Sequence, residues 1–158
     1  MYQSHSLKED LKKSLGPEWI SSRSGPGGAK LMYLEGKTAI NLANELFGYD
    51  GWSSQVKESV VDFFDISDDG KINLGIATTV RVTLKDGTYH EDIGYGVADN
   101  MKTKASAFEK ARKESTTDGM KRALRMFGNA LGNCVYDKTY LRNISTMARS
   151  TVSRNDIL

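Results

Sequence analysis

The sequence predicts an α+β fold in which an antiparallel β-β-β meander packs on a long helix. Apolar and polar residues alternate over residues 72–84, which is the period of a strand with one buried face. Turn sequences containing Asp and Gly at 67–70 and 85–87 separate this stretch from candidate strands at 56–66 and 88–95. We expect the three strands to form a meander with one buried face and the sheet to end at Gly94-Tyr95-Gly96. A helical period then follows the third strand, which gives the order β-β-β-α.

Short elements precede the meander. The Ser6-Leu7-Lys8-Glu9 motif has the form of a capping box, so we expect a short amphipathic helix that ends before Gly16-Pro17. A glycine-rich loop over 24–28 leads into a strand at 30–34. A second helix is predicted at 38–46, capped by Gly48, and its inward residues are Ala39, Leu42, Ala43 and Leu46.

The long helix is expected to begin after residues 100–104, to bend at 115–117 and to end at Gly128. A row of apolar residues gathers on the side that packs, at about 100° per residue: Met120, Leu124, Phe127 and Leu131. Beyond Tyr140 the chain is polar, and residues 143–158 are interpreted as a polar tail.

Three basic residues share another side of this helix. Lys121 and Arg125 lie one turn apart and Arg122 lies beside them, so this side can meet an anion. The alternative is a solvated helix face on which Asp118 pairs with Lys121 and Arg122 at spacings of three and four residues.

Composition predicts one domain spanning 1–158, because 158 residues with 39% hydrophobic content suit a single core. Cys134 is the only cysteine and cannot form an internal disulfide. The chain has no signal-like N-terminus and no apolar run near ~20 residues. We therefore expect a soluble, intracellular protein without a membrane partner.

Charge is distributed unevenly along the chain. Residues 1–100 hold 10 Lys and Arg against 15 Asp and Glu, whereas residues 101–158 hold 12 against 5. This asymmetry favours a surface for a polyanion built from the later segment.

Motifs for catalysis and metal binding are incomplete. Gly36-Lys37-Thr38 resembles the end of a phosphate-binding loop, but Leu31 stands where the first glycine is required. The acidic turn at 65–72 begins like a calcium loop, yet Ile76 replaces its last carboxylate ligand. With two histidines and one cysteine, no metal or nucleophile pattern is present, so we expect no enzyme, no cofactor and no metal.

Several aromatic residues could stack on nucleobases, although aromatics in strands and turns more often belong to the core. These are Tyr33, Phe47, Tyr49, Trp52 and Tyr95.

An ordered set of motifs, matched from about Leu7 to Arg142 with nearly constant spacing, resembles one known family. The chain is similar to the N-terminal domain of the Rad fifty-two recombination and strand-annealing proteins. The motifs are GPEWIS at 16–21, INLAN at 40–44, FGY at 47–49, GW at 51–52, RV at 81–82, EDIGYG at 91–96, and FGNALGNC at 127–134 following Asp118, Lys121, Arg122 and Arg125.

The resemblance implies subunits that assemble into a closed ring and bind single-stranded DNA in an outer basic groove. It implies annealing of complementary strands without ATP in homologous recombination and double-strand-break repair, in the nucleus. By position, the inner DNA site would comprise Arg23, Tyr33, Lys121, Arg122 and Arg125. An outer site for a second strand or a duplex would comprise Lys71, Lys102, Lys138 and Arg142.

Two expectations limit this assignment. Family members usually continue into a long C-terminal half that contacts the recombinase and the single-strand-binding protein, so these two partners are expected only if such a region exists. The alternative function is an RNA-binding or protein-interaction module that uses the same basic helix.

Overall fold

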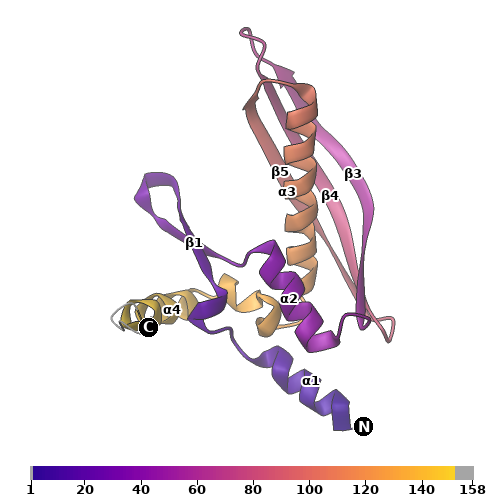
Figure 1. Cartoon of the computed structure of the whole chain (residues 1–158), viewed down its shortest axis with the longest axis vertical. Coiled ribbons are helices and arrows are strands. Elements are labelled where there is room, and N and C mark those ends of the chain that lie inside the picture. The colour runs from indigo at the N-terminus through magenta and orange to yellow at the C-terminus, as the bar shows by residue number, and fades with distance from the viewer. Residues whose placement is uncertain (1, 152–158) are drawn as a thin grey trace, which may run out of the picture.

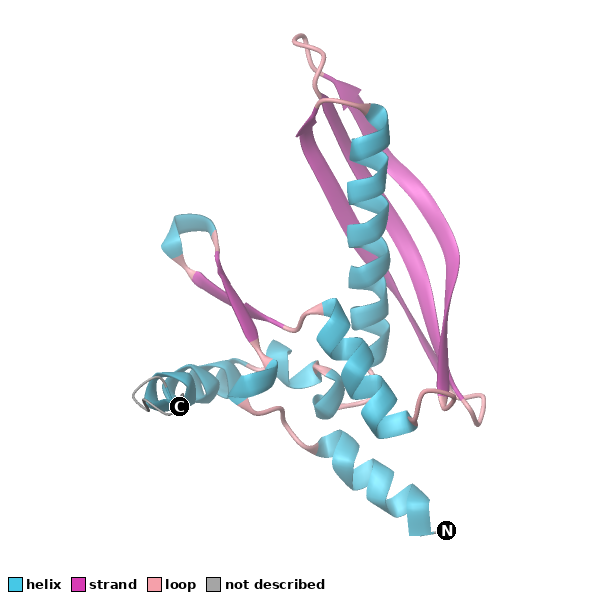
Figure 2. Cartoon of the chain, in the orientation of Figure 1, coloured by secondary structure: helices cyan, strands magenta, loops and turns pink. Residues whose placement is uncertain are grey.

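The α+β class and the β-β-β-α order are confirmed by the structure, a computed structural model that describes residues 2–151, with side chains described for 7–147. The structure contains a three-stranded sheet. Figure 1 shows a long helix along this sheet and the smaller elements gathered at one end of that helix. Figure 2 shows that these smaller elements are mostly helical, apart from one two-stranded hairpin.

The sheet has the strand order β3-β4-β5 and is antiparallel throughout. β3 spans Trp52–Ile66, β4 spans Ile72–Leu84 and β5 spans Tyr89–Met101. The predicted turns at 67–70 and 85–87 are confirmed, but β3 begins before residue 56 and β5 continues beyond residue 95. The register of β3 against β4 shifts at two places, between Val56 and Glu58 and between Val61 and Phe63.

The long helix α3 spans Lys104–Arg125 and lies over β4 and β5. The bend expected at 115–117 is wrong, because the helix runs through these residues without interruption. Ser115 is fully buried, and its hydroxyl lies 2.7 Å from the hydroxyl of Thr78 on β4, so the helix is fixed to the sheet at this point.

Small residues allow α3 to approach β5 closely. A Cβ atom added to Gly94 would lie 2.1 Å from the Gly119 backbone nitrogen, and one added to Gly96 would lie 2.1 Å from the Ala111 carbonyl oxygen. The prediction that the sheet ends at Gly94 and Gly96 is therefore wrong. Both lie inside β5, at positions where only a residue without a side chain fits against the backbone of α3.

Burial agrees with the predicted alternation in β4 but not in β3. Leu74, Ile76, Val80 and Val82 are buried beneath α3. By contrast, β3 is exposed over nearly its whole length. The expectation of one buried face across the whole meander is therefore wrong for β3, which lies at the sheet edge where α3 hardly reaches.

The first helix differs from its prediction. α1 spans Tyr2–Lys12, so Ser6 lies inside the helix and the predicted capping box at its start is wrong. The helix also ends at Lys12, earlier than the predicted end just before Gly16-Pro17, and Leu15 is buried in the core after the helix has ended.

The next element is a hairpin, of which the sequence predicted only the second strand. β1 (Ser21–Ser24) pairs with β2 (Lys30–Tyr33) in antiparallel register, and Gly27 and Gly28 have positive φ angles of 71° and 77° in the turn between them. The strand at β2 is confirmed, whereas β1 was not predicted. The glycine-rich loop is thus the end of a hairpin that projects beside α3 (Figure 1).

The remaining helices frame the base of α3. α2 spans Gly36–Phe47, ends at the predicted Gly48 cap, and buries Ala39, Leu42 and Ala43. After α3, two 3₁₀ turns, Asn129–Leu131 and Asn133–Tyr136, reverse the chain. α4 then spans Lys138–Thr151, so a helix forms where the sequence predicted no element, and residues 152–158 of the expected tail lie outside the described residues.

None of the helices within residues 2–151 has the length and apolar character needed to cross a membrane.

Candidate nucleic-acid interface

A cleft lies between the β1–β2 hairpin and the C-terminal half of α3. It consists of two adjoining hollows of about 280 and 590 Å³, which share Arg23, Asp118 and Lys121 in their walls. Tyr33 and Arg125 line the smaller hollow, and Arg122 lines the larger one. The five residues predicted for the inner site are therefore brought together, although they come from three separate elements.

The hairpin supplies Arg23 and Tyr33. The register pairs Ser21 with Tyr33, so Arg23, two residues further along β1, is on the same face of the hairpin. The Arg23 guanidinium carbon lies 5.5 Å from the centre of the Tyr33 ring, and the Lys121 ammonium lies 5.8 Å from it. One aromatic ring in the wall of the cleft thus contacts two cations.

Lys121 joins the helix to the hairpin. Its ammonium donates a hydrogen bond to the Leu34 carbonyl oxygen at 3.0 Å, directly after β2. Burial lowers the pKa of Lys121 below its ordinary value, while Asp118 acts in the opposite direction and Arg23 adds to the lowering. A half-buried cation with two further arginines nearby favours the approach of an anion, although Asp118 offsets part of this charge.

Arg122 is paired within the chain. Its Nε donates to Asp118 Oδ2 at 2.9 Å, and the Arg122 side chain remains 41% exposed. The hydrogen bond and charge of Asp118 raise the pKa of Arg122. The predicted pairing of Asp118 is therefore confirmed for Arg122 but not for Lys121, which bonds to Leu34. The same Asp118 oxygen accepts the backbone N–H of Tyr95 at 3.0 Å, so it also ties α3 to β5.

Arg125 is held by residues that the sequence did not single out. Its Nη1 donates to Asn133 Oδ1 at 3.0 Å, and its guanidinium carbon lies 4.2 Å from the centre of the Tyr136 ring. Positive φ angles at Gly128 and Gly132 turn the chain back toward α3 and bring these two side chains to Arg125. Helical spacing cannot reveal them because they lie beyond the end of the helix.

The four residues predicted for the outer site form two separate pairs. Lys71 and Lys102 flank the paired residues Ile72 and Met101, so they are close together at the far end of the sheet. Lys138 and Arg142 lie one turn apart on α4. Figure 1 shows that α4 and the far end of the sheet lie at opposite ends of the molecule, so the two pairs do not form one surface within a single chain.

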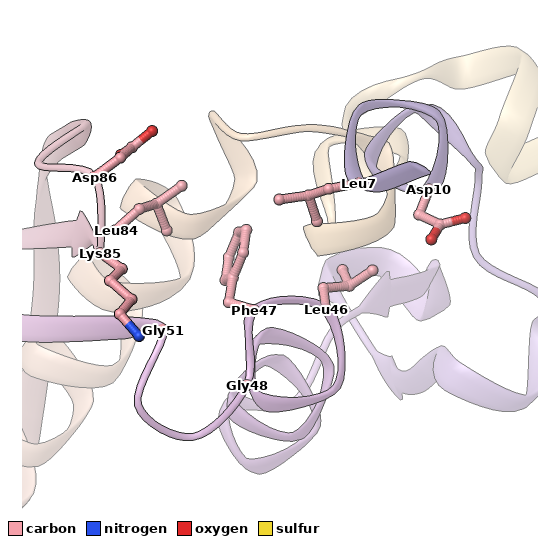
Figure 3. Close-up of a pocket in the computed structure, with 9 residues that line it drawn as sticks. All are labelled: Leu7, Asp10, Leu46, Phe47, Gly48, Gly51, Leu84, Lys85 and Asp86. Atoms are coloured by element: carbon pink, nitrogen blue, oxygen red, sulfur yellow. The ribbon is translucent and has the colours of Figure 1, made fainter. Parts of the chain in front are cut away.

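A further hollow of about 540 Å³ lies between α1, the end of α2 and the β4–β5 turn (Figure 3). Leu7, Leu46, Phe47 and Leu84 give it apolar walls, and Lys85 is its only basic residue. Within the described part of the chain, no group of three His, Cys, Asp or Glu side chains could hold a metal ion.

The cleft suits a chain of phosphates more than a small neutral ligand. Lys121, Arg122 and Arg125 are presented along one side of a helix, and Arg23 faces them from the hairpin. Such groups can neutralise successive phosphates and release counterions without contacting base edges.

Comparison with known proteins agrees with the sequence motifs. Residues 3–153 match the family described as Rad52/22 family double-strand break repair protein. The DNA repair and recombination protein rad22 of Schizosaccharomyces pombe is 58% identical over 146 residues, covering 92% of this chain and 31% of that protein. The DNA repair and recombination protein radC of Emericella nidulans is 55% identical over 152 residues, covering 96% of this chain and 26% of that protein.

The DNA repair and recombination protein RAD52 of Saccharomyces cerevisiae is 53% identical over 141 residues, covering 89% of this chain and 30% of that protein. The chain thus spans about a quarter to a third of the length of these three relatives. Because the family match extends over nearly the whole sequence, in agreement with the ordered motifs, the chain belongs to the Rad52/22 family of double-strand break repair proteins.

Proposed function

We propose that this protein binds single-stranded DNA in the cleft between the β1–β2 hairpin and α3 and anneals complementary strands without ATP. The observation that carries the proposal is the convergence of Arg23, Lys121 and Arg125 on one hollow, although Arg23 is about a hundred residues from the other two in sequence. The process served would be homologous recombination and double-strand-break repair, in keeping with the names of the relatives, and we propose the nucleus as its place.

Annealing needs a surface that is indifferent to sequence. Contacts to phosphates position a strand and carry no base information, so bases of the bound strand stay available for a second strand. Pairing energy then selects the product, as it does wherever a protein holds one strand by its backbone. The cations lower the repulsion between the two strands during their encounter.

Arg122→Ala is expected to weaken single-strand binding and slow annealing about tenfold, because it removes a charged donor and leaves the negative charge of Asp118 in the cleft without its paired cation. Fluorescence anisotropy and strand-annealing assays without nucleotide would measure the two effects. Arg81→Ala is the matched control, because Arg81 pairs with Glu91 on the sheet face away from α3. Unchanged binding by a folded Arg122→Ala protein would remove this residue from the site.

We also propose that the chain forms rings by self-association. β3 is an edge strand of 15 residues with exposed apolar side chains, among them Val56, Val60 and Ile66 at 52%, 48% and 58% exposure. A long, exposed, apolar edge is the kind of surface that another chain covers. The β5 edge is different, because Asp118 accepts from the Tyr95 N–H and Lys110 donates to the Val97 carbonyl.

Replacing Val56 and Val60 with Asp is expected to reduce the size of the assembly, since buried charges at the contact would be unpaired. Sedimentation velocity would measure this size. Tyr49→Asp is the control, because Tyr49 is 87% exposed in the loop between α2 and β3. An assembly of unchanged size in the double variant, or a wild-type protein that sediments as a monomer, would contradict the proposal.

The proposed activity includes no chemical step. Gly36-Lys37-Thr38 forms the first turn of α2, where the Lys37 ammonium lies 4.0 Å from Glu35. We expect no nucleotide hydrolysis by the purified protein. Turnover of ATP that disappears in Lys37→Ala would contradict this expectation.

A further inference from the structure

Tyr136 is placed in the cleft by the buried turn that follows α3. It ends the 3₁₀ turn Asn133–Tyr136, and its neighbours Leu131 and Cys134 are 1% and 2% exposed. These buried neighbours fix the backbone, while Tyr136 as a whole is 59% exposed and lines the 280 Å³ hollow. The ring is therefore held at the cleft and contributes little to the core.

One face of the Tyr136 ring is occupied by Arg125, whose guanidinium carbon lies 4.2 Å from the ring centre. Asn133 fixes the same guanidinium from its other end at 3.0 Å. The Arg125 Nε is buried and has no hydrogen-bond partner within the described residues, so the ring and Asn133 carry the orientation of this side chain. Because Arg125 lies over one face and more than half of the residue is exposed, the opposite face is the one that can receive a ligand.

Tyr33, which lines the same hollow from the hairpin, is in a different situation. Its ring is approached by both Arg23 and Lys121. Among the described residues, Arg125 is the one cation that lies over the Tyr136 ring, while the Tyr136 hydroxyl also interacts electrostatically with Arg122. An open aromatic face beside phosphate-binding cations is the usual platform on which a single-strand-binding protein stacks a base, because every base has a π face.

We propose that the open face of Tyr136 receives a nucleobase of the bound single strand, while Arg125, on the opposite face, holds a neighbouring phosphate. This inference rests on the proposed function of the cleft. It adds a base contact that is indifferent to sequence to a site otherwise built from cations, and it assigns Asn133 as the residue that positions Arg125.

The test compares two ligands of equal length, a thymidine oligonucleotide and an abasic oligonucleotide that keeps the phosphates and lacks the bases. Tyr136→Ala is expected to weaken binding of the thymidine oligonucleotide about tenfold and to leave binding of the abasic one nearly unchanged. Tyr136→Phe keeps the aromatic face and is expected to bind both like the wild type. Tyr89→Ala serves as the matched control, because Tyr89 is 51% exposed, also has an arginine over its ring, and lies on the sheet face away from the cleft.

If Tyr136→Ala lost the same affinity for both oligonucleotides, the proposed base contact would be overturned, because Tyr136 would then act only through Arg125. Unchanged binding of the thymidine oligonucleotide by Tyr136→Ala would overturn it too, as would a loss in Tyr136→Phe as large as that in Tyr136→Ala. Thermal unfolding of each variant confirms that a folded protein is being compared. Wild-type protein that fails to bind the thymidine oligonucleotide would instead overturn the proposed function itself.

Discussion

Replacing both Lys121 and Arg125 with alanine is expected to weaken single-stranded DNA binding about a hundredfold at physiological salt. Each of the two side chains supplies a cation in the hollow beneath the hairpin. Loss of two phosphate contacts also makes the negative slope of log affinity against log salt concentration shallower by about 1.4, because each contact on a single strand contributes about 0.7. Anisotropy titrations across a salt series measure both quantities.

The control removes the same net charge elsewhere. Lys12 and Lys85 have side chains that are 75% and 78% exposed and lie outside the cleft. Their joint replacement with alanine is expected to change affinity only slightly. If this control loses as much affinity as the cleft variant, then overall charge binds the DNA, and the cleft has no special role.

Gly94→Ala is expected to have the largest effect on stability, a loss of about 3 kcal/mol or more. The added methyl group would lie 2.1 Å from the Gly119 nitrogen and 2.2 Å from the Ser115 carbonyl oxygen, and both are backbone atoms of α3. α3 would have to move away from β5. Thermal unfolding should show a midpoint lower by about 6–12 °C.

Gly70→Ala is the control for this variant. Gly70, in the β3–β4 turn, has a φ of 80°, and no atom lies within 4 Å of an added Cβ. The Gly70→Ala variant should therefore lose only about 1 kcal/mol of stability, because alanine is less favourable than glycine in the left-handed backbone conformation. A midpoint for Gly94→Ala equal to that for Gly70→Ala would show that α3 does not depend on close contact with β5.

The meander was predictable because its signals are local. The alternation in β4 and the turns at 67–70 and 85–87 depend on neighbouring residues. The extent of β5 was not predictable, because Gly94 and Gly96 are sequence signals for a turn. Their actual role is to accommodate a helix that packs against them only in the folded chain.

The β1 strand could not be found from periodicity. Its sequence, Ser21–Ser24, carries no apolar alternation, and it is a strand only because β2 pairs with it. This pairing positions Arg23 at the cleft. Arg23 was predicted for the site from family resemblance. Periodicity alone predicted only the basic residues of α3.

Within the candidate site, helical spacing was sufficient for Lys121, Arg122 and Arg125. It could not show that Lys121 bonds to Leu34 or that Arg122 is paired with Asp118, since both depend on tertiary contacts. Asn133 and Tyr136 were missed for another reason. The chain turns back at Gly128 and Gly132 through positive φ angles, and no periodic pattern continues through such a turn.

Two dye-labelled complementary oligonucleotides, mixed with the purified protein in the absence of nucleotide across a salt series, test the central claim most directly. We predict annealing faster than the spontaneous reaction, with an acceleration that fades as salt rises and that is largely lost in the Lys121 and Arg125 double variant. Tight single-strand binding without any acceleration would contradict the claim, and would mean that the cleft holds DNA but does not pair it.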